Sequence, residues 1–135
     1  KLVPDAALDE VLDQAFDTVV LPGGLPGSDY LAADPRVTAL LQRMARAGRF
    51  TCAICAAPAV LAKAGLLEGK RATSYPGVLE ELGLPGVSST GEAVVRDGTV
   101  ITSRGPGTAM DFALALVEAL EGDAVRARVE KSLVR

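Results

Sequence analysis

The sequence contains no histidine and no tryptophan, and its only aromatic residues are three phenylalanines and two tyrosines. Without histidine, the chain cannot by itself supply the Cys-His or Ser-His pair on which many hydrolases depend. No apolar run reaches the ~18 residues that span a bilayer, and no signal peptide precedes the first expected strand. We therefore expect no membrane association and a cytoplasmic location.

Clustered positive charge and a set of disulfide-forming cysteines are also missing. The net charge of -3 argues against nucleic acid as a partner, because phosphate binding needs grouped Lys and Arg side chains. Two cysteines do not make a secreted disulfide scaffold. The 135 residues, 49% of them hydrophobic, suffice for one domain with a buried core.

The chain begins at Lys1, inside what reads as the end of a strand, "KLVPDA". We expect residues 1–135 to form a single domain that lacks an N-terminal piece. That piece would have been cleaved, would be disordered, or would belong to a companion chain.

Strand-like runs alternate with helical patterns over the first half of the chain. "DTVVLPGG" holds a run that is apolar on both faces, Thr18 to Leu21, and closes with a glycine turn, as a buried parallel strand does. A helix is expected over 34–48, with Asp34 as its N-cap and Pro35 at the first helical position. The other elements expected here are a short acidic helix at 7–15, strands at 50–54 and 71–75, and a helix at 57–65.

The second half contains a short helix within 76–86, a hairpin and two further helices. The hairpin, "EAVVRDGTVITS", turns at Asp97-Gly98, a dipeptide favoured in tight turns. Thr108 and Asp111 are expected to form a capping pair for the helix in 105–122, and Asp123 to cap the last helix. The alternation predicts an α/β fold with a mostly parallel sheet covered on both faces. Ligands of such sheets lie beyond the carboxyl ends of the strands, where "LPGG" and "AICAA" fall.

"FTCAICAAP" holds the only two cysteines, in a C-x-x-C arrangement. A thioredoxin-like redox pair needs its first cysteine exposed at a helix N-terminus, whereas Cys52 lies inside the apolar run. A metal site would need further Cys or His ligands, which the chain lacks, so no metal is expected. Cys52 is most simply a small buried hydrophobic residue.

Cys55 falls where the strand gives way to a helix. A side chain there projects into the cleft, as the serine of a nucleophile elbow does, and the helix N-terminus favours a thiolate. The N–H groups of Gly24 and Ala56 would face a carbonyl attacked by Cys55 and form an oxyanion hole. The alternatives are a purely structural Cys55, and a Gly23-Gly24 pair that only makes a turn.

Four segments resemble the ThiJ/PfpI superfamily in order and spacing: "DTVVLPGG", "AICAAP", "TSYP" and "TSRGPGTAMDFALALVEAL". The similarity covers the chain from Pro4 onward and is closest to the branch of the parkinsonism-associated protein deglycase and its bacterial relatives. It implies a flavodoxin-like three-layer sandwich, of the class I glutamine amidotransferase-like type, and a homodimer without a cofactor. It also implies that Cys55 is a nucleophilic, easily oxidised cysteine, with Gly24 and Ala56 as the oxyanion-hole donors.

Two positions differ from the family pattern. Relatives often have a histidine where "TSYP" has Tyr75, so a Cys-His dyad is excluded within this chain. The family also places a glutamate beside the cysteine, in a βαβ unit that would precede "KLVPDA". Tyr75 is expected to line the pocket together with Gly23, Arg104 and Pro106. For Arg104, an ion pair at the surface or an interface is the alternative.

The function expected is that of a cysteine-dependent deglycase or glyoxalase, acting on methylglyoxal or on glycated protein in defence against carbonyl and oxidative stress. The alternative is a non-catalytic, redox-sensing or chaperone-like stress protein whose Cys55 is oxidised to the sulfinate. A peptidase or amidase is disfavoured, because amide cleavage needs an acid to protonate the leaving nitrogen.

Overall fold

The computed structural model describes residues 1–135 and contains six α-helices and six strands. The helices are α1 (Leu8–Val11), α2 (Gly27–Ala33), α3 (Pro35–Arg46), α4 (Pro58–Lys63), α5 (Ala109–Glu121) and α6 (Asp123–Ser132). The strands are β1 (Thr18–Leu21), β2 (Phe50–Ile54), β3 (Lys70–Ala72), β4 (Val87–Ser89), β5 (Val94–Asp97) and β6 (Val100–Ser103). None of the helices has the length and apolar character needed to cross a bilayer.

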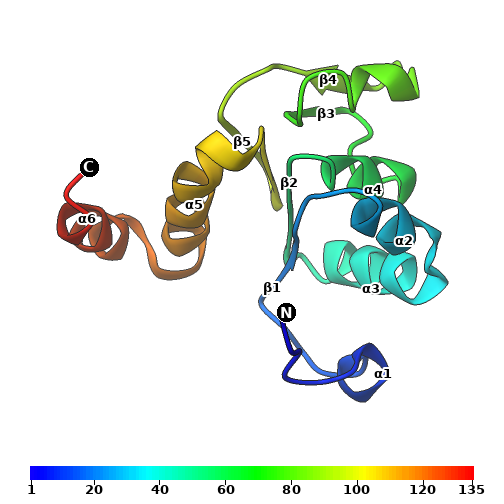
Figure 1. Ribbon diagram of the computed structural model, residues 1–135, viewed down its shortest axis with the longest axis horizontal. Helices are drawn as coiled ribbons and strands as arrows, with labels where there is room; N and C mark the ends of the chain where they lie inside the picture. Colours follow the sequence, from blue (N-terminus) through cyan, green and yellow to red (C-terminus); the bar gives the residue numbers. More distant parts are fainter.

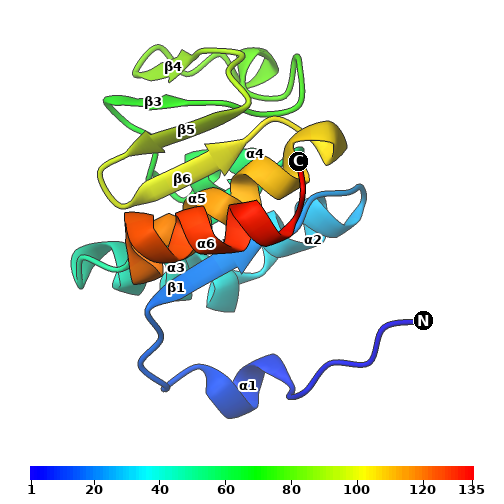
Figure 2. The same cartoon turned by 90° about the vertical axis from the view of Figure 1, so that its left-hand side faces the viewer.

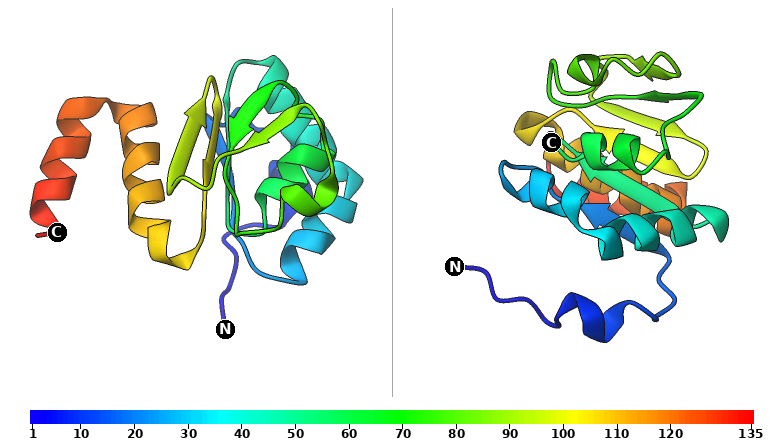
Figure 3. Two further views of the ribbon diagram at one scale, coloured as in Figure 1. Left: turned by 90° about the horizontal axis from the view of Figure 1, so that it is seen from above. Right: turned by 90° about the vertical axis from the view of Figure 1, so that its right-hand side faces the viewer.

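A four-stranded sheet in the order β1-β2-β6-β5 forms the centre of the molecule. In Figure 1 it is seen edge-on, with α2, α3 and α4 on one side and α5 on the other. Helix α6 lies outside α5 and runs beside it, as Figure 3 shows from above. Strands β1, β2 and β6 are parallel, and only β5 is antiparallel, because the tight turn at Asp97-Gly98 returns the chain directly. These features confirm a mostly parallel, flavodoxin-like α/β fold.

A second, two-stranded sheet consists of β3 and β4, which pair in parallel. Strand β3 lies beside β5, so the two sheets follow one another in Figure 2. Side chains as well as backbone groups join them: the buried Thr73 N–H donates to Thr102 Oγ1 at 3.0 Å, and Thr73 Oγ1 donates to the Glu92 carbonyl at 2.7 Å. Further along the chain, the Tyr75 N–H donates to the carbonyl of Cys55, the residue that follows β2, at 2.8 Å.

Both faces of β2 are buried, as its uninterrupted apolar sequence predicts. Its residues alternate between the two layers of helices. Cys52 faces α5 and packs with Ile101 and Phe112. Ala53 faces the other way and belongs to the larger core formed with α3 and α4, in which Leu41 and Leu61 are fully buried. Strand β2 therefore runs through the buried interior and ends just before Cys55, at the carboxyl end of the sheet.

Strand β1 is an edge strand, which corrects the expectation that it is buried on both faces. It pairs only with β2, and the Val20 side chain is 41% exposed although Leu21 is buried. The strand β3 is also shorter than expected, since it ends at Ala72. Helix α2 and strand β4 were not predicted, because "GSDYLAA" lacks a clear apolar stripe and "VSS" is too short to show alternation.

The two C-terminal caps were predicted wrongly. The Thr108 hydroxyl bonds Ser103 Oγ at 2.7 Å and the Gly105 carbonyl at 2.9 Å, and so it caps no α5 amide. Asp111 instead pairs with Arg135 at 2.7 Å. The N-cap of α6 is Gly122, and Asp123 is the first helical residue. In contrast, Asp34 caps α3 as expected, accepting a hydrogen bond from the Arg36 N–H at 2.9 Å.

Candidate active site

Cys55 occupies a strained turn between β2 and α4. Its φ of 66° lies in the left-handed region, which residues other than glycine rarely adopt. Two backbone hydrogen bonds hold this conformation: the Cys55 N–H donates to the Ser103 carbonyl at 3.0 Å, and the Cys55 carbonyl accepts from the Tyr75 N–H at 2.8 Å. The side chain is half-buried. The turn thus projects the thiol from the carboxyl end of the central strand.

Gly23 brings the "LPGG" turn into close contact with Cys55. A Cβ atom at Gly23 would lie 2.7 Å from Cys55 Cβ and 2.9 Å from the Ile54 carbonyl oxygen, closer than non-bonded atoms approach. Gly24 serves a different purpose, because its φ of 97° requires a residue without a side chain. Gly23 is therefore needed because a side chain there would clash, and Gly24 because of its backbone conformation.

Two backbone N–H groups beside Cys55 have no partner in the chain. Neither the Gly24 nor the Ala56 N–H donates a hydrogen bond to any backbone or side-chain acceptor. The Ala56 nitrogen lies 3.5 Å from the position that a Gly23 Cβ would occupy, so it faces the glycine turn. Unpaired donors at a nucleophile are what an oxyanion hole requires. Their role in binding an oxyanion stays a prediction.

An open depression of about 200 Å³ is lined by Tyr75, Arg104 and Pro106, three of the four residues expected to line the pocket around the cysteine. The Tyr75 backbone bonds Cys55 directly, whereas the residue as a whole is 53% exposed. Arg104 donates to the Gly91 carbonyl at 2.9 Å and pairs with no carboxylate. The structure thus gathers these three residues, whereas neither Cys55 nor Gly23 lines the depression, and none of the three bonds the thiol.

A second groove adjoins the site, and its residues were missed from the sequence. It has a volume of about 310 Å³ and lies between α2, α4 and the 78–82 segment. Ala56 forms one of its walls, and Leu25, the residue after Gly24, forms another. Nothing in the sequence indicated this groove, because helix α2, which forms one of its sides, was not predicted.

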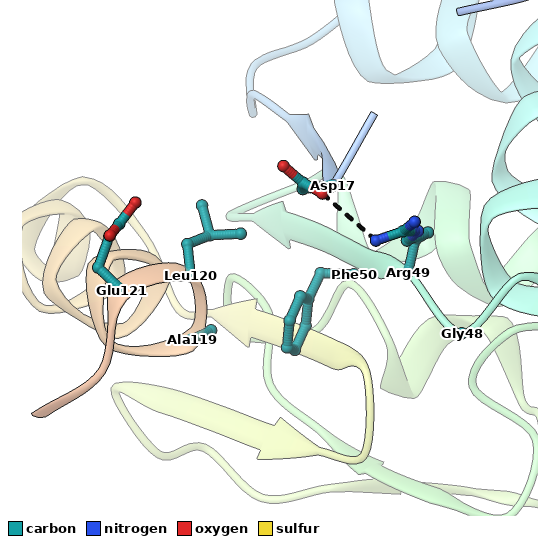
Figure 4. A pocket seen from close by; sticks show the side chains of 7 residues that line it. All are labelled: Asp17, Gly48, Arg49, Phe50, Ala119, Leu120 and Glu121. Atoms are coloured by element: carbon teal, nitrogen blue, oxygen red, sulfur yellow. Dashed lines mark hydrogen bonds and ion pairs between the residues drawn. The ribbon is translucent and has the colours of Figure 1, made fainter. Parts of the chain in front are cut away.

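A further cavity, of about 330 Å³, lies at the opposite end of the sheet, where β1 and β2 begin. Figure 4 shows its lining, with Phe50 between the Arg49–Asp17 ion pair (3.3 Å) and the end of α5. It contains no cysteine and no serine. Since ligands of parallel sheets lie at the carboxyl ends of the strands, we assign this cavity no part in the chemistry.

Cys52 contrasts with Cys55. It is fully buried, and its sulfur lies 3.5 Å from Thr18 Oγ1. Burial raises the pKa of the Cys52 thiol above its ordinary value, although the bond to Thr18 acts in the opposite direction. Both cysteines are free, so the C-x-x-C segment forms no disulfide. Cys52 is the buried hydrophobic residue expected from its position in the strand.

Comparison with known proteins agrees with this arrangement. The DJ-1/PfpI family model matches residues 1–119. Protein dj-1beta of Drosophila melanogaster is 44% identical over 134 residues, which make up 99% of this chain and 72% of that protein. The glutathione-independent glyoxalase DJR-1.2 of Caenorhabditis elegans is 41% identical over 122 residues, 90% of this chain and 64% of that protein.

Solved structures are equally similar. The crystal structure of Drosophila DJ-1beta superposes with a TM-score of 0.93 at 45% identity, covering 98% of this chain and 72% of the fly chain. Oxidised Toxoplasma gondii DJ-1 superposes with a TM-score of 0.89 at 31% identity, covering 96% and 70% of the two chains. The fold, the elbow cysteine and these matches together establish that the chain belongs to the DJ-1/PfpI family.

Proposed function

We propose that this chain is a cysteine-dependent glyoxalase or deglycase that detoxifies reactive carbonyl compounds. The observation that carries the proposal is the strained Cys55, half-buried and flanked by the unpaired N–H groups of Gly24 and Ala56. The similarity to a glutathione-independent glyoxalase supports it. As the family resemblance implies, we expect a cytoplasmic homodimer that acts on a small carbonyl compound or on glycated protein.

With methylglyoxal, the Cys55 thiolate adds to the aldehyde carbon and forms a hemithioacetal. The developing alkoxide accepts hydrogen bonds from the Gly24 and Ala56 N–H groups. The hydrogen on the former aldehyde carbon then moves to the ketone carbon through proton transfers. The first carbon is thereby oxidised to a thioester and the second is reduced to an alcohol. Water hydrolyses the thioester, releasing lactate and the free thiol, so no outside oxidant or reductant is consumed.

Substitution of the two cysteines tests this proposal. We expect Cys55→Ser to lower kcat/KM for lactate formation by at least about 100-fold, because loss of a covalent nucleophile costs several powers of ten in well-studied enzymes. Cys52→Ala is the matched control and should stay within about twofold of wild type, provided that circular dichroism confirms its fold. Equal lactate formation by wild type and Cys55→Ser would overturn the proposal.

The redox-sensing role is the second candidate, favoured by the exposure of Cys55 relative to the buried Cys52 and by the oxidised state of the Toxoplasma relative. The same proteins separate the two roles. Sensing without turnover requires that peroxide add two oxygens to Cys55 before Cys52 while the reduced wild type forms no lactate. Lactate formation that depends on Cys55 selects the enzyme instead.

A further inference from the structure

We propose that the groove between α2 and α4 is a substrate subsite that selects α-oxoaldehydes with a neutral, ring-sized tail bearing a hydroxyl group. The inference rests on the carbonyl chemistry proposed for Cys55 and names the substrates that this site prefers. At about 310 Å³, the groove matches the smallest ligand pockets of proteins, which begin at roughly 300 Å³.

The position of the groove links it to the reacting group. Ala56, which lines it, directly follows Cys55 in the chain and carries one of the two unpaired N–H groups. Leu25, which also lines it, directly follows Gly24, the other proposed donor. A substrate whose carbonyl oxygen accepts from these two N–H groups therefore has its tail at the mouth of the groove.

Ser28 gives the groove a specific polar group. The residue is 3% exposed, and its Oγ has no hydrogen-bond partner. Serine in a helix commonly bonds the carbonyl four residues earlier, but here only the Ser28 N–H bonds Gly24, at 2.9 Å. Buried hydroxyl groups without partners are unusual and call for an explanation. Rotation about the Cα–Cβ bond moves Oγ among three staggered positions, so a ligand in the groove can engage it.

The remaining lining determines what kind of tail fits. Leu25, Ala59 and Val78 provide apolar walls against which a ring can pack. The charged side chains at the groove are Asp29, Glu81 and Lys63, two acids against one base. This balance disfavours an anionic tail, since like charges repel. The groove thus suits an apolar ring with one uncharged hydrogen-bonding group for Ser28.

The test compares phenylglyoxal with 4-hydroxyphenylglyoxal and measures formation of mandelate and 4-hydroxymandelate. Wild type should prefer the hydroxylated substrate. Ser28→Ala should reduce that preference about 2- to 12-fold, the range that one net hydrogen bond supplies. Ala59→Leu, which fills the groove, should impair both aromatic substrates more than it impairs methylglyoxal. Ser88→Ala, an exposed serine on β4, is the matched control and should change nothing.

Binding of unreactive ketones separates this inference from the proposed function. Calorimetry with 4-hydroxyacetophenone and acetophenone needs no turnover, so it reports on the groove even if the protein lacks glyoxalase activity. We expect tighter binding of the hydroxylated ketone, an effect lost in Ser28→Ala, and no binding to Ala59→Leu. Unchanged binding of both ketones by both variants, or no binding to wild type, overturns the inference.

Discussion

Two sulfur atoms three residues apart have opposite environments because one residue lies within a strand and the other just beyond it. Cys52 points into the core against Phe112 and Ile101. Cys55 follows the last strand residue, where the chain turns with positive φ. Their chemistry is thus decided by backbone position, and a cysteine pair in sequence does not make a functional pair in space.

At this scale we expect Gly23→Ala to displace Cys55. The added Cβ would lie 2.7 Å from Cys55 Cβ, so the turn must shift, at a cost of about 1–3 kcal/mol in unfolding free energy. Lactate formation and the rate of Cys55 alkylation should both change. Gly27→Ala is the matched control, because a Cβ there meets nothing within 4 Å and its φ is not positive. A Gly23→Ala protein identical to wild type in stability and alkylation rate would refute this account.

The sequence allowed the elbow to be located but not the contacts around it. The run "FTCAI" followed by "APAV" predicts a strand-to-helix junction, and Cys55 lies there. That Gly23, rather than Gly24, makes the close approach depends on how two separate turns meet across the sheet. The unpaired Ser28 hydroxyl likewise results from the packing of α2, which no local pattern specifies.

Among the helices, local signals were reliable where no group outside the helix competed for the capping side chain. Asp34 caps α3, and its carboxylate also bonds the Arg36 guanidinium, two residues away. Thr108 has the same kind of signal, but Ser103 and Gly105 take its hydroxyl, and Arg135 takes the Asp111 carboxylate. Cap prediction fails there because groups outside the helix compete with the helix amides for these side chains.

We expect the Asp34 cap to stabilise the protein in a pH-dependent way. Hydrogen bonds from the Arg36 side chain and backbone lower the pKa of Asp34 from 3.8 to about 2. The stabilisation is therefore complete above the unfolded-state value near ~4 and is lost as the pH falls towards 2. Urea unfolding should rank wild type above Asp34→Asn, which keeps only the cap, and Asp34→Ala lowest at pH 7.

The same series between pH 7 and 2 provides the control. The advantage of wild type over Asp34→Asn should shrink as the carboxylate is protonated, whereas the gap between Asp34→Asn and Asp34→Ala should persist. A wild-type advantage that stays constant down to pH 2 would show that the charge of Asp34 has no part in the effect.

On the scale of the whole molecule, two sheets are joined by buried hydroxyl groups. Thr73 connects the end of β3 to Thr102 on β6 and to Glu92 before β5. The alternation of strands and helices predicted the large sheet, but nothing local indicated that β3 and β4 would form a separate one. The sheets are separate because β3 pairs with β4 and β5 pairs with β6. Which strands pair depends on the assembled fold.

We expect Thr102→Val to weaken this connection. The substitution leaves the buried Thr73 N–H without its acceptor, which costs about 1–3 kcal/mol in unfolding free energy. Hydrogen exchange should rise most in residues 70–90. Thr99→Val, half-buried at the hairpin turn and without a side-chain hydrogen bond, is the control and should differ little from wild type. If exchange in residues 70–90 is no faster in Thr102→Val than in Thr99→Val, the two sheets are not linked through this hydroxyl group.

Main-chain hydrogen bonds hold Cys55 from two sides. Its N–H donates to the Ser103 carbonyl of β6, and its own carbonyl accepts from the Tyr75 N–H. These two bonds use no side-chain atom, so they remain available when Tyr75 or Ser103 is exchanged for a residue other than proline. We therefore expect substitutions at Leu25, Ser28 or Arg104, which make neither of these bonds, to leave the backbone of Cys55 in place. The residues that line the adjoining groove and depression can thus vary while the turn that carries the thiol is retained.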